Sequence, residues 1–213
     1  MGVDVKICGL NDPAAVAAAI GGGARLVGFV FFAASPRAVT PAKAGELGKA
    51  VPPSVTKVGL VVDADDRFLA DIVKHSKIDL LQLHGHESPQ RVVEIKARFG
   101  LPVMKVLAVG SEADVEAARA YEDVADRLMF DAKPPQGATR PGGNARVFDW
   151  ELLGGHTWRK PWILAGGLNA DNVAEAVRVS GATAVDVSSG VEDVPGRKDP
   201  KKILEFLRVA STL

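Results

Sequence analysis

The only cysteine of the chain, Cys8, lies where a strand is predicted to end and a helix to begin. It closes the run Val5-Lys6-Ile7 and precedes Gly9 and Asp12-Pro13, a helix start with proline just inside the cap. A free thiol is usually a small buried hydrophobe, so packing is one interpretation. A thiol at the mouth of a sheet can instead titrate. Lys6, two residues earlier on the same strand face, would then favour the thiolate.

Asp131 is a carboxyl group that could act together with this thiol. It ends the apolar run Leu128-Met129-Phe130, and desolvation by such neighbours suits a carboxyl group to proton donation. The alternative is that Asp131 caps the turn at 131–134. If both residues act, Cys8 and Asp131 supply one potential base and one potential acid from two different strands.

Two glycine-containing segments predict an anion site. Gly166-Gly167 and Ser188-Ser189-Gly190 each follow an apolar run and precede a predicted helix or turn. Glycine lets backbone N–H groups approach an anion, and the helix dipole favours negative charge at that end. The alternative is that these glycines only permit tight turns. Because the two segments belong to adjacent units, the pattern favours phosphate as the ligand.

Three further polar residues follow apolar runs. Arg37 comes after Ser35-Pro36, which stiffens the segment and so preorganises the guanidinium for a carboxylate; a solvated loop arginine is the alternative. His84 fits a hydrogen-bonding or packing role better than a metal site, because the four histidines of the chain offer no facial triad with carboxylates. Asp186 ends the last apolar run and joins the same polar set.

Short β-branched runs alternate with Ala-rich amphipathic stretches, and this alternation must position the polar set. The predicted strands are 3–7, 26–31, 57–62, 80–83, 103–106, 128–131, 162–164 and 184–187. The predicted helices are 12–20, 41–50, 66–75, 89–99, 112–120, 169–179 and 200–211. Repeated strand-then-helix units predict a parallel sheet covered by right-handed crossovers. Ligands bind such sheets at the carboxyl ends of the strands.

Closure of this sheet into a barrel is favoured by the even spacing of its units. Eight units in 213 residues have about 27 residues each, near the lower size limit of a (β/α)8 barrel. A doubly wound open sheet is the alternative. The expected helix caps are Asp65, Ser88, Ser111 and Asn169 at N-termini and Gly21-Gly22-Gly23, Gly100 and Gly181 at C-termini. No Gly/Ser/Pro linker divides the repeat, so residues 1–213 are predicted to form a single TIM barrel domain of eight parallel strands inside a ring of helices.

The longest interruption of the repeat is the segment 133–147. Its three prolines and three glycines exclude a helix or a central strand. A loop of this length in a compact domain often has a function, such as covering an active site. A tolerated surface insertion is the alternative.

Composition excludes several classes of function. Twenty-six Lys and Arg residues balance twenty-six Asp and Glu residues, so no global field attracts nucleic acid or an anionic membrane. One cysteine excludes an internal disulfide and a multi-cysteine metal cluster, which fits a reducing cytoplasm. No window is long and apolar enough to span a bilayer, and no signal peptide is expected. We therefore expect a cytoplasmic protein.

In their order along the chain, the motifs closely resemble the phosphoribosylanthranilate isomerase family of tryptophan biosynthesis. The matching segments are Lys6-Ile7-Cys8-Gly9-Leu10, Gly28-Phe29-Val30-Phe31 with Ser35-Pro36-Arg37, Leu81-Gln82-Leu83-His84-Gly85, Asp131 with Gly142-Gly143 and Phe148-Asp149-Trp150, Ala165-Gly166-Gly167-Leu168, and 186–192 with Gly196, Lys198 and Asp199. The chain departs from the family pattern at Phe32-Ala33-Ala34 and at Gly142-Gly143-Asn144-Ala145.

The resemblance implies a (β/α)8 barrel that converts N-(5-phosphoribosyl)anthranilate to 1-(2-carboxyphenylamino)-1-deoxyribulose 5-phosphate by an Amadori rearrangement, without metal or cofactor. It implies that Asp131 is the general acid, that Cys8 is the general base and that Arg37 holds the anthranilate carboxylate. The phosphate would be held by Gly166, Gly167, Ser188, Ser189 and Gly190, and His84 and Asp186 would line the substrate. An aldose-to-ketose shift needs one acid and one base, which agrees with this set.

Two other kinds of protein remain as alternatives. One is a different sugar-phosphate barrel: a pentulose-phosphate epimerase, expected to present metal-binding histidines, or a histidine-pathway ketol isomerase, expected to have two aspartates where this chain has Cys8 and Asp131. The other is a binding barrel that keeps only the phosphate site, which retention of both proton-transfer residues disfavours. The expected partner is a small phosphorylated substrate, with no nucleic acid and no membrane, and the sequence is compatible with a monomer.

Overall fold

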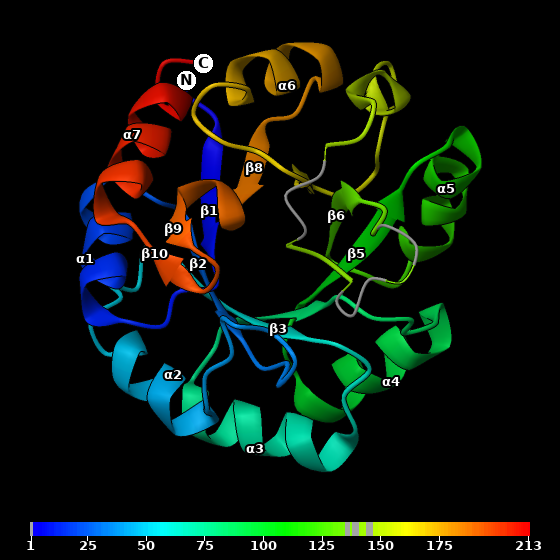
Figure 1. Ribbon diagram of the computed structural model, residues 1–213. Coiled ribbons are helices and arrows are strands. Elements are labelled where there is room, and N and C mark those ends of the chain that lie inside the picture. The colour runs from blue at the N-terminus through cyan, green and yellow to red at the C-terminus, as the bar shows by residue number, and fades with distance from the viewer. Residues whose placement is uncertain (1, 135–136, 138–140, 144–146) are drawn as a thin grey trace.

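The computed structural model describes residues 2–134, 137, 141–143 and 147–213, and in it eight parallel strands form a closed barrel (Figure 1). The strands are β1 (Asp4–Cys8), β2 (Leu26–Val30), β3 (Thr56–Val61), β4 (Leu80–Leu83), β5 (Val103–Val109), β6 (Arg127–Ala132), β7 (Trp162–Leu164) and β8 (Ala184–Val187). Neighbouring strands pair in chain order, and β1 pairs with β8, with Lys6 opposite Asp186. The predicted closure is confirmed, and the open-sheet alternative is wrong.

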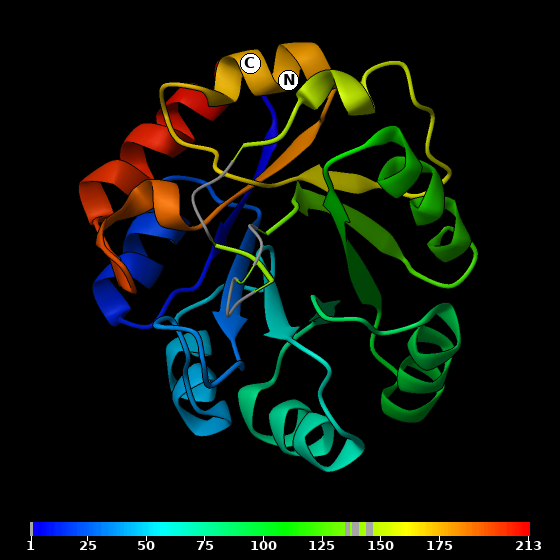
Figure 2. The ribbon, with the colours of Figure 1, turned by 45° about the vertical axis from the view of Figure 1, so that its right-hand side comes forward.

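Helices form a ring outside these strands (Figure 2). They are α1 (Pro13–Gly21), α2 (Pro41–Gly48), α3 (Asp66–Ser76), α4 (Pro89–Phe99), α5 (Glu112–Ala117), α6 (Val173–Ser180) and α7 (Pro200–Ala210). Short 3-10 helices are η1 (Ala118–Tyr121), η2 (Trp150–Leu153) and η3 (Ser189–Val191). The predicted helix 112–120 is thus divided between α5 and η1, because its last turn tightens.

Most predicted helix caps are present. Asp65, Ser88 and Ser111 each accept a hydrogen bond from a backbone N–H in the first turn of α3, α4 and α5. Gly100 and Gly181 adopt left-handed conformations after α4 and α6, with φ of 65° and 71°.

The predicted start of a helix at Asn169 is wrong. The helix α6 begins at Val173. The Asn169 side chain accepts hydrogen bonds from the backbone N–H groups of Asp171 (2.9 Å) and Asn172 (3.1 Å). This local bonding stabilises a turn, which competes with the helix and delays its start.

Two apolar cores hold the barrel. Inside the sheet, the inward side chains of alternate strand positions form a layer of Leu26, Val58, Leu80, Met104, Val106, Met129, Ile163, Ala165 and Ala184. Outside it, the opposite faces of the strands pack against the helices. Because side chains alternate along a strand, the inward positions nearest the carboxyl ends belong to neither core. These positions carry residues of the site, both polar and apolar.

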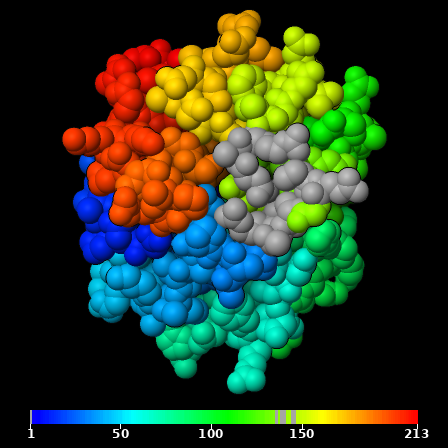
Figure 3. Space-filling view, in the orientation of Figure 1, coloured from blue at the N-terminus to red at the C-terminus, as the bar shows by residue number. Residues whose placement is uncertain are grey.

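A two-stranded hairpin between β8 and α7 was not predicted. Its strands β9 (Glu192–Val194) and β10 (Arg197–Lys198) are antiparallel. Gly196 forms its turn with φ of 88°, and a Cβ there would lie 2.5 Å from the carbonyl oxygen of Pro36. The hairpin therefore packs directly against the loop after β2, and Figures 1 and 3 show these two segments side by side at the mouth of the barrel. Within the described residues, no helix has the length and apolar character required to cross a membrane.

Candidate active site

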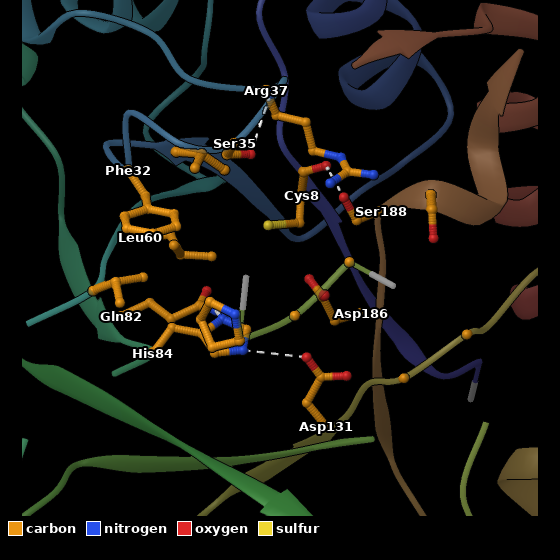
Figure 4. Close-up of a pocket in the computed structure, with 18 of the residues that line it drawn as sticks. Cys8, Phe32, Ser35, Arg37, Leu60, Gln82, His84, Asp131, Asp186 and Ser188 are labelled. Carbon is orange, nitrogen blue, oxygen red and sulfur yellow. Dashed lines mark hydrogen bonds and ion pairs between the residues drawn. The ribbon is translucent and has the colours of Figure 1, made fainter. Parts of the chain in front are cut away.

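A pocket opens at the carboxyl ends of the strands. All site residues predicted from the sequence line it except Gly190, namely Cys8, Arg37, His84, Asp131, Gly166, Gly167, Asp186, Ser188 and Ser189. Figure 4 shows Cys8 and Asp131 on different sides of this pocket. The topology therefore brings together residues that are spread over almost the whole sequence.

The thiol of Cys8 lies beside a buried ion pair. Lys6 is fully buried, and its Nζ donates a hydrogen bond of 2.7 Å to Oδ1 of Asp186. A Cβ placed on Gly28 would lie 3.2 Å from both Cys8 Sγ and Lys6 Nζ, so the absence of a side chain there leaves room for both groups. Burial raises the pKa of the Cys8 thiol, and the positive charge of Lys6 opposes that rise. The predicted placement of Lys6 next to the thiol is confirmed.

The ion pair also affects its own lysine. Burial lowers the pKa of Lys6, but the charges of Asp186 and Cys8 outweigh this effect and leave the pKa raised. Lys6 thus stays protonated at neutral pH. The thiol consequently has a permanent positive charge on one side and the carboxylate of Asp186 beyond it.

Asp131 lies against His84. Its Oδ2 is 3.2 Å from Nε2 of His84, and its Oδ1 accepts a hydrogen bond of 2.8 Å from the backbone N–H of Ala132. The amide Nε2 of Gln82 lies 3.3 Å from the other ring nitrogen of His84. His84 therefore has the hydrogen-bonding role predicted for it. Gln82, which connects to Asp131 through this ring, was not predicted as a site residue.

The guanidinium group of Arg37 is partly occupied by a carboxylate of the protein itself. It is 4% exposed, and its Nε and Nη2 donate hydrogen bonds of 2.6 and 2.9 Å to the two carboxylate oxygens of Glu192. The solvated-loop alternative is therefore wrong. One bidentate edge of the guanidinium is already used within the protein. Among the described residues, no hydrogen bond engages the other edge, which Nη1 and the second hydrogen of Nη2 form.

The two predicted phosphate loops border the pocket. Gly166 and Gly167 have φ of 93° and 63°, a backbone conformation that favours glycine. Ser189 begins the 3-10 helix η3, as the predicted turn after the last strand requires. Gly190 lies behind the pocket wall, because a Cβ there would be 2.0 Å from the carbonyl oxygen of Leu168. Glycine at position 190 lets the backbone pass this close to Leu168.

One wall of the pocket is apolar, and no sequence motif predicted it. Val30 and Leu60 form a buried cluster with Cys8, and Phe32 and Val62 pack against it. These residues are the inward positions at the ends of β2 and β3, so the strand alternation alone could have identified them. An apolar wall of this kind fits a flat hydrocarbon ring.

Two polar residues at predicted strand ends, Asp63 and Lys105, do not line the pocket. Nζ of Lys105 donates to Glu87 (2.8 Å) and to the carbonyl of Gly85 (2.7 Å), while Glu87 accepts from the backbone N–H of Asp63 (2.9 Å). Glu87 and Lys105 are buried, and these hydrogen bonds connect the loops after β3 and β4.

Part of the segment 133–147 lies over the pocket. Gly142 is so close that an added Cβ would be 2.6 Å from Asp131 Oδ2 and 2.6 Å from His84 Cε1, and one on Gly143 would be 2.6 Å from Arg37 Nη1. The described residues 141–143 line the pocket, which favours the covering role over a surface insertion. Asn144 and Ala145, where the chain departs from the family pattern, lie outside the described residues.

Replacing Gly142 by alanine is expected to lower kcat/KM by about 10²-fold, because the new methyl group must displace either the loop or the Asp131–His84 pair. Steady-state kinetics checks this result. Gly21→Ala is the matched control, since a Cβ there would contact nothing within 4 Å. An unchanged kcat/KM in the Gly142→Ala variant would show that this loop does not cover the reacting groups.

The closed eight-stranded barrel belongs to the (β/α)8 class, in which the loops after the seventh and eighth strands frequently form a phosphate site. Among the described residues, no three His, Cys, Asp or Glu side chains are grouped to hold a metal ion.

Known relatives place the chain within this class. A family model described as N-(5'-phosphoribosyl)anthranilate (PRA) isomerase matches residues 5–209. The N-(5'-phosphoribosyl)anthranilate isomerase of Paramagnetospirillum magneticum is 59% identical over 210 residues, covering 99% of this chain and 98% of that protein. The Rhodospirillum centenum protein of the same name is 56% identical over 214 residues, covering 100% of both chains.

Solved structures agree. The phosphoribosyl anthranilate isomerase of Thermotoga maritima is 35% identical with a TM-score of 0.88, covering 99% of this chain and 100% of that one. A second structure of such an isomerase, at 33% identity and a TM-score of 0.84 with the same coverage, contains reduced 1-(o-carboxyphenylamino)-1-deoxyribulose 5-phosphate. The chain belongs to the PRA isomerase family and is an isomerase of tryptophan biosynthesis.

Proposed function

We propose that this chain catalyses the Amadori rearrangement of N-(5'-phosphoribosyl)anthranilate to 1-(2-carboxyphenylamino)-1-deoxyribulose 5-phosphate, with Asp131 as general acid and Cys8 as general base. The observation that carries the proposal is that these two side chains line one pocket together with an arginine, an apolar wall and two glycine loops. The reaction is an intramolecular oxidoreduction, in which C1 of the sugar is reduced while C2 is oxidised. It needs no redox cofactor, because both electrons stay within the substrate, and in this proposal Asp131 and Cys8 transfer the protons without a metal ion.

The first step is ring opening. Asp131 donates its proton to the furanose ring oxygen, the bond between that oxygen and C1 breaks, and the anthranilate nitrogen forms an iminium with C1. The remaining carboxylate of Asp131 is stabilised by His84 at 3.2 Å and by the backbone N–H of Ala132.

The second step is proton removal from C2. The Cys8 thiolate takes this proton, and the electron pair moves through C1 to the iminium nitrogen to give an enolamine. The enolamine then tautomerises to the C2 ketone: C1 takes up a proton and the C2 hydroxyl gives one up. The iminium makes the C2 proton acidic enough for a thiolate, so the acid must act before the base.

The substrate is held by groups that match its two anions and its ring. The free edge of Arg37 binds the anthranilate carboxylate, and the ring packs on Val30, Phe32 and Leu60. The phosphate is held at Gly167 and Ser189, which line the pocket on the loops after β7 and β8.

The experiment that tests this function is incubation of the purified chain with N-(5'-phosphoribosyl)anthranilate, with the product identified by NMR. We expect the C2 ketone of the carboxyphenylamino-deoxyribulose phosphate to appear in proportion to enzyme concentration. A substrate that binds but is not converted would instead indicate a binding barrel.

The charges around Cys8 predict two opposite shifts in pH dependence. The base must be a thiolate, so kcat/KM rises with pH through the Cys8 pKa, which burial raises. Lys6→Met removes a charge that lowers this pKa, so the rising limb should move to higher pH. Asp186→Asn removes a charge that raises it, so the limb should move to lower pH.

The pH profile of kcat/KM for both variants measures these shifts. Lys49→Met is the control, because Lys49 is exposed and pairs with Glu46 on the surface. Shifts in the same direction for Lys6→Met and Asp186→Asn would contradict the assignment of the limb to Cys8.

A further inference from the structure

The carboxylate of Glu192, on the hairpin strand β9, is buried between two cations. It is 8% exposed, while Arg37 and Lys198 are each 4% exposed. Glu192 Oε1 lies 2.6 Å from Arg37 Nε and 2.8 Å from Lys198 Nζ, and Oε2 lies 2.9 Å from Arg37 Nη2. The backbone N–H of Gly196 also donates to Oε2, at 3.2 Å. Each of the two Glu192 oxygens thus accepts two hydrogen bonds, and these four bonds fix the orientation of the carboxylate.

The cation Lys198 extends this cluster to the predicted phosphate loop. Its Nζ donates to the carbonyl oxygen of Ser188 at 2.8 Å and contacts Ser188 Oγ at 3.2 Å. A peptide unit is planar, with its N–H opposite its C=O. Since Lys198 holds the Ser188 carbonyl, the N–H of Ser189 must point away from Lys198. Ser189 lines the pocket and Lys198 does not, so Lys198 fixes the Ser188–Ser189 peptide from outside the lining residues.

Arg37 is fixed at the other side of the same carboxylate. Burial favours a raised pKa for Glu192, but hydrogen bonds from Arg37 and the charge of Lys198 outweigh it and leave the pKa lowered, so the group stays ionised. An ionised carboxylate on the Nε edge of Arg37 leaves only the outer edge for a ligand. Figure 4 shows Arg37 and Ser188 on the same side of the pocket as Cys8, and Ser188 Oγ donates to the Cys8 carbonyl at 3.2 Å.

We propose that Glu192 is a positioning residue that couples the two anion-binding groups of the pocket, holding Arg37 for the substrate carboxylate and, through Lys198, the Ser188–Ser189 peptide for the phosphate. The proposal rests on the proposed function, because it assigns these two groups to the two anions of that substrate. Glu192 itself is not among the residues that line the pocket, so it acts through Arg37 and Lys198.

Two probes, each carrying one anionic group, test Arg37 and the Ser188–Ser189 peptide separately. Anthranilate reports on the carboxylate group and inorganic phosphate on the phosphate group, each measured as a competitive inhibitor of the isomerase. In Glu192→Gln we expect both probes to bind roughly 10- to 100-fold more weakly, the range expected when a charged hydrogen bond is lost. In Lys198→Met we expect only phosphate to bind more weakly.

The sign of the Glu192→Gln effect distinguishes positioning from charge. If Glu192 only neutralised positive charge, its replacement by glutamine would strengthen the binding of both anions. Tighter binding, or weakening of a single probe, would therefore overturn the proposal. Asp193→Asn is the matched control, since Asp193 is the adjacent carboxylate on the same strand but pairs with Arg197 at the exposed surface. It should leave both inhibition constants unchanged.

Folding and the proposed function are checked separately. Circular dichroism on heating compares the variants with the wild type. If Glu192→Gln does not fold, Glu192→Asp takes its place: the shorter side chain cannot reach both cations, so both probes should again bind more weakly, and unchanged binding would overturn the proposal. If the wild type turns over substrate but the variants keep the wild-type inhibition constants for both probes, the coupling through Glu192 is refuted and the proposed function is not. No turnover by the wild type refutes the function on which it rests.

Discussion

Replacing Asp131 by asparagine is expected to lower kcat by about 10²- to 10⁴-fold, the usual contribution of a general acid. Asparagine keeps the size and most contacts of the side chain, but it has no proton to give to the furanose oxygen. Without that proton the ring does not open and the iminium does not form. The later step at Cys8 then has no activated C2 proton to remove. Steady-state rates measured by loss of substrate fluorescence give the size of the effect.

If the loss of kcat reflects the missing proton transfer, the Asp131→Asn variant must still bind ligand. Reduced 1-(o-carboxyphenylamino)-1-deoxyribulose 5-phosphate, the compound bound in a related isomerase, serves as the probe and should bind Asp131→Asn within a few-fold of the wild type. Asp71→Asn is the control, because Asp71 is a surface carboxylate of α3 whose partner is His75. Loss of probe affinity in proportion to kcat would mean that Asp131 binds the substrate and is not the acid.

Replacing Cys8 by serine is expected to lower kcat by about 10²- to 10⁴-fold for a different reason. The hydroxyl is nearly isosteric with the thiol, but it is far less acidic and does not ionise beside Lys6 at neutral pH. The ring still opens, since Asp131 is intact, but the C2 proton stays in place.

The wild-type thiol can be followed directly because it is the only one in the chain. The ultraviolet absorbance of the thiolate should rise over the same pH range as kcat/KM. Alkylation of Cys8 should be slowed by the bound product analogue, since Cys8 lines the pocket. If kcat/KM levelled off before any thiolate formed, another group would have to be the base.

The fold was predictable because its signals are local. Strand 80–83, helix 89–99 and the caps Ser88 and Gly100 follow from a short apolar run, proline at the first turn and glycine after the last. The start of α6 could not be predicted in this way, since Asn169 bonds equally well to a turn or to a helix. The hairpin at Glu192–Lys198 depends on contact with the loop at Pro36, which is distant in sequence.

The candidate site was predictable where a residue type and its strand position were enough. Cys8, Asp131 and Gly167 each stand at the carboxyl end of a strand, and barrel closure alone brings them together. Long-range partners could not be derived. Nothing local indicates that Glu192 occupies one edge of Arg37, or that His84 lies against Asp131. These contacts depend on the geometry of the closed barrel.

The central claim is that Cys8 and Asp131 act as base and acid on one substrate in one pocket. Its most direct test is the rate at which N-(5'-phosphoribosyl)anthranilate fluorescence is lost with the wild type, Cys8→Ser and Asp131→Asn assayed side by side. We predict turnover by the wild type in proportion to enzyme concentration and a loss of at least about 10²-fold in each variant. Near-normal turnover by both variants would contradict the claim.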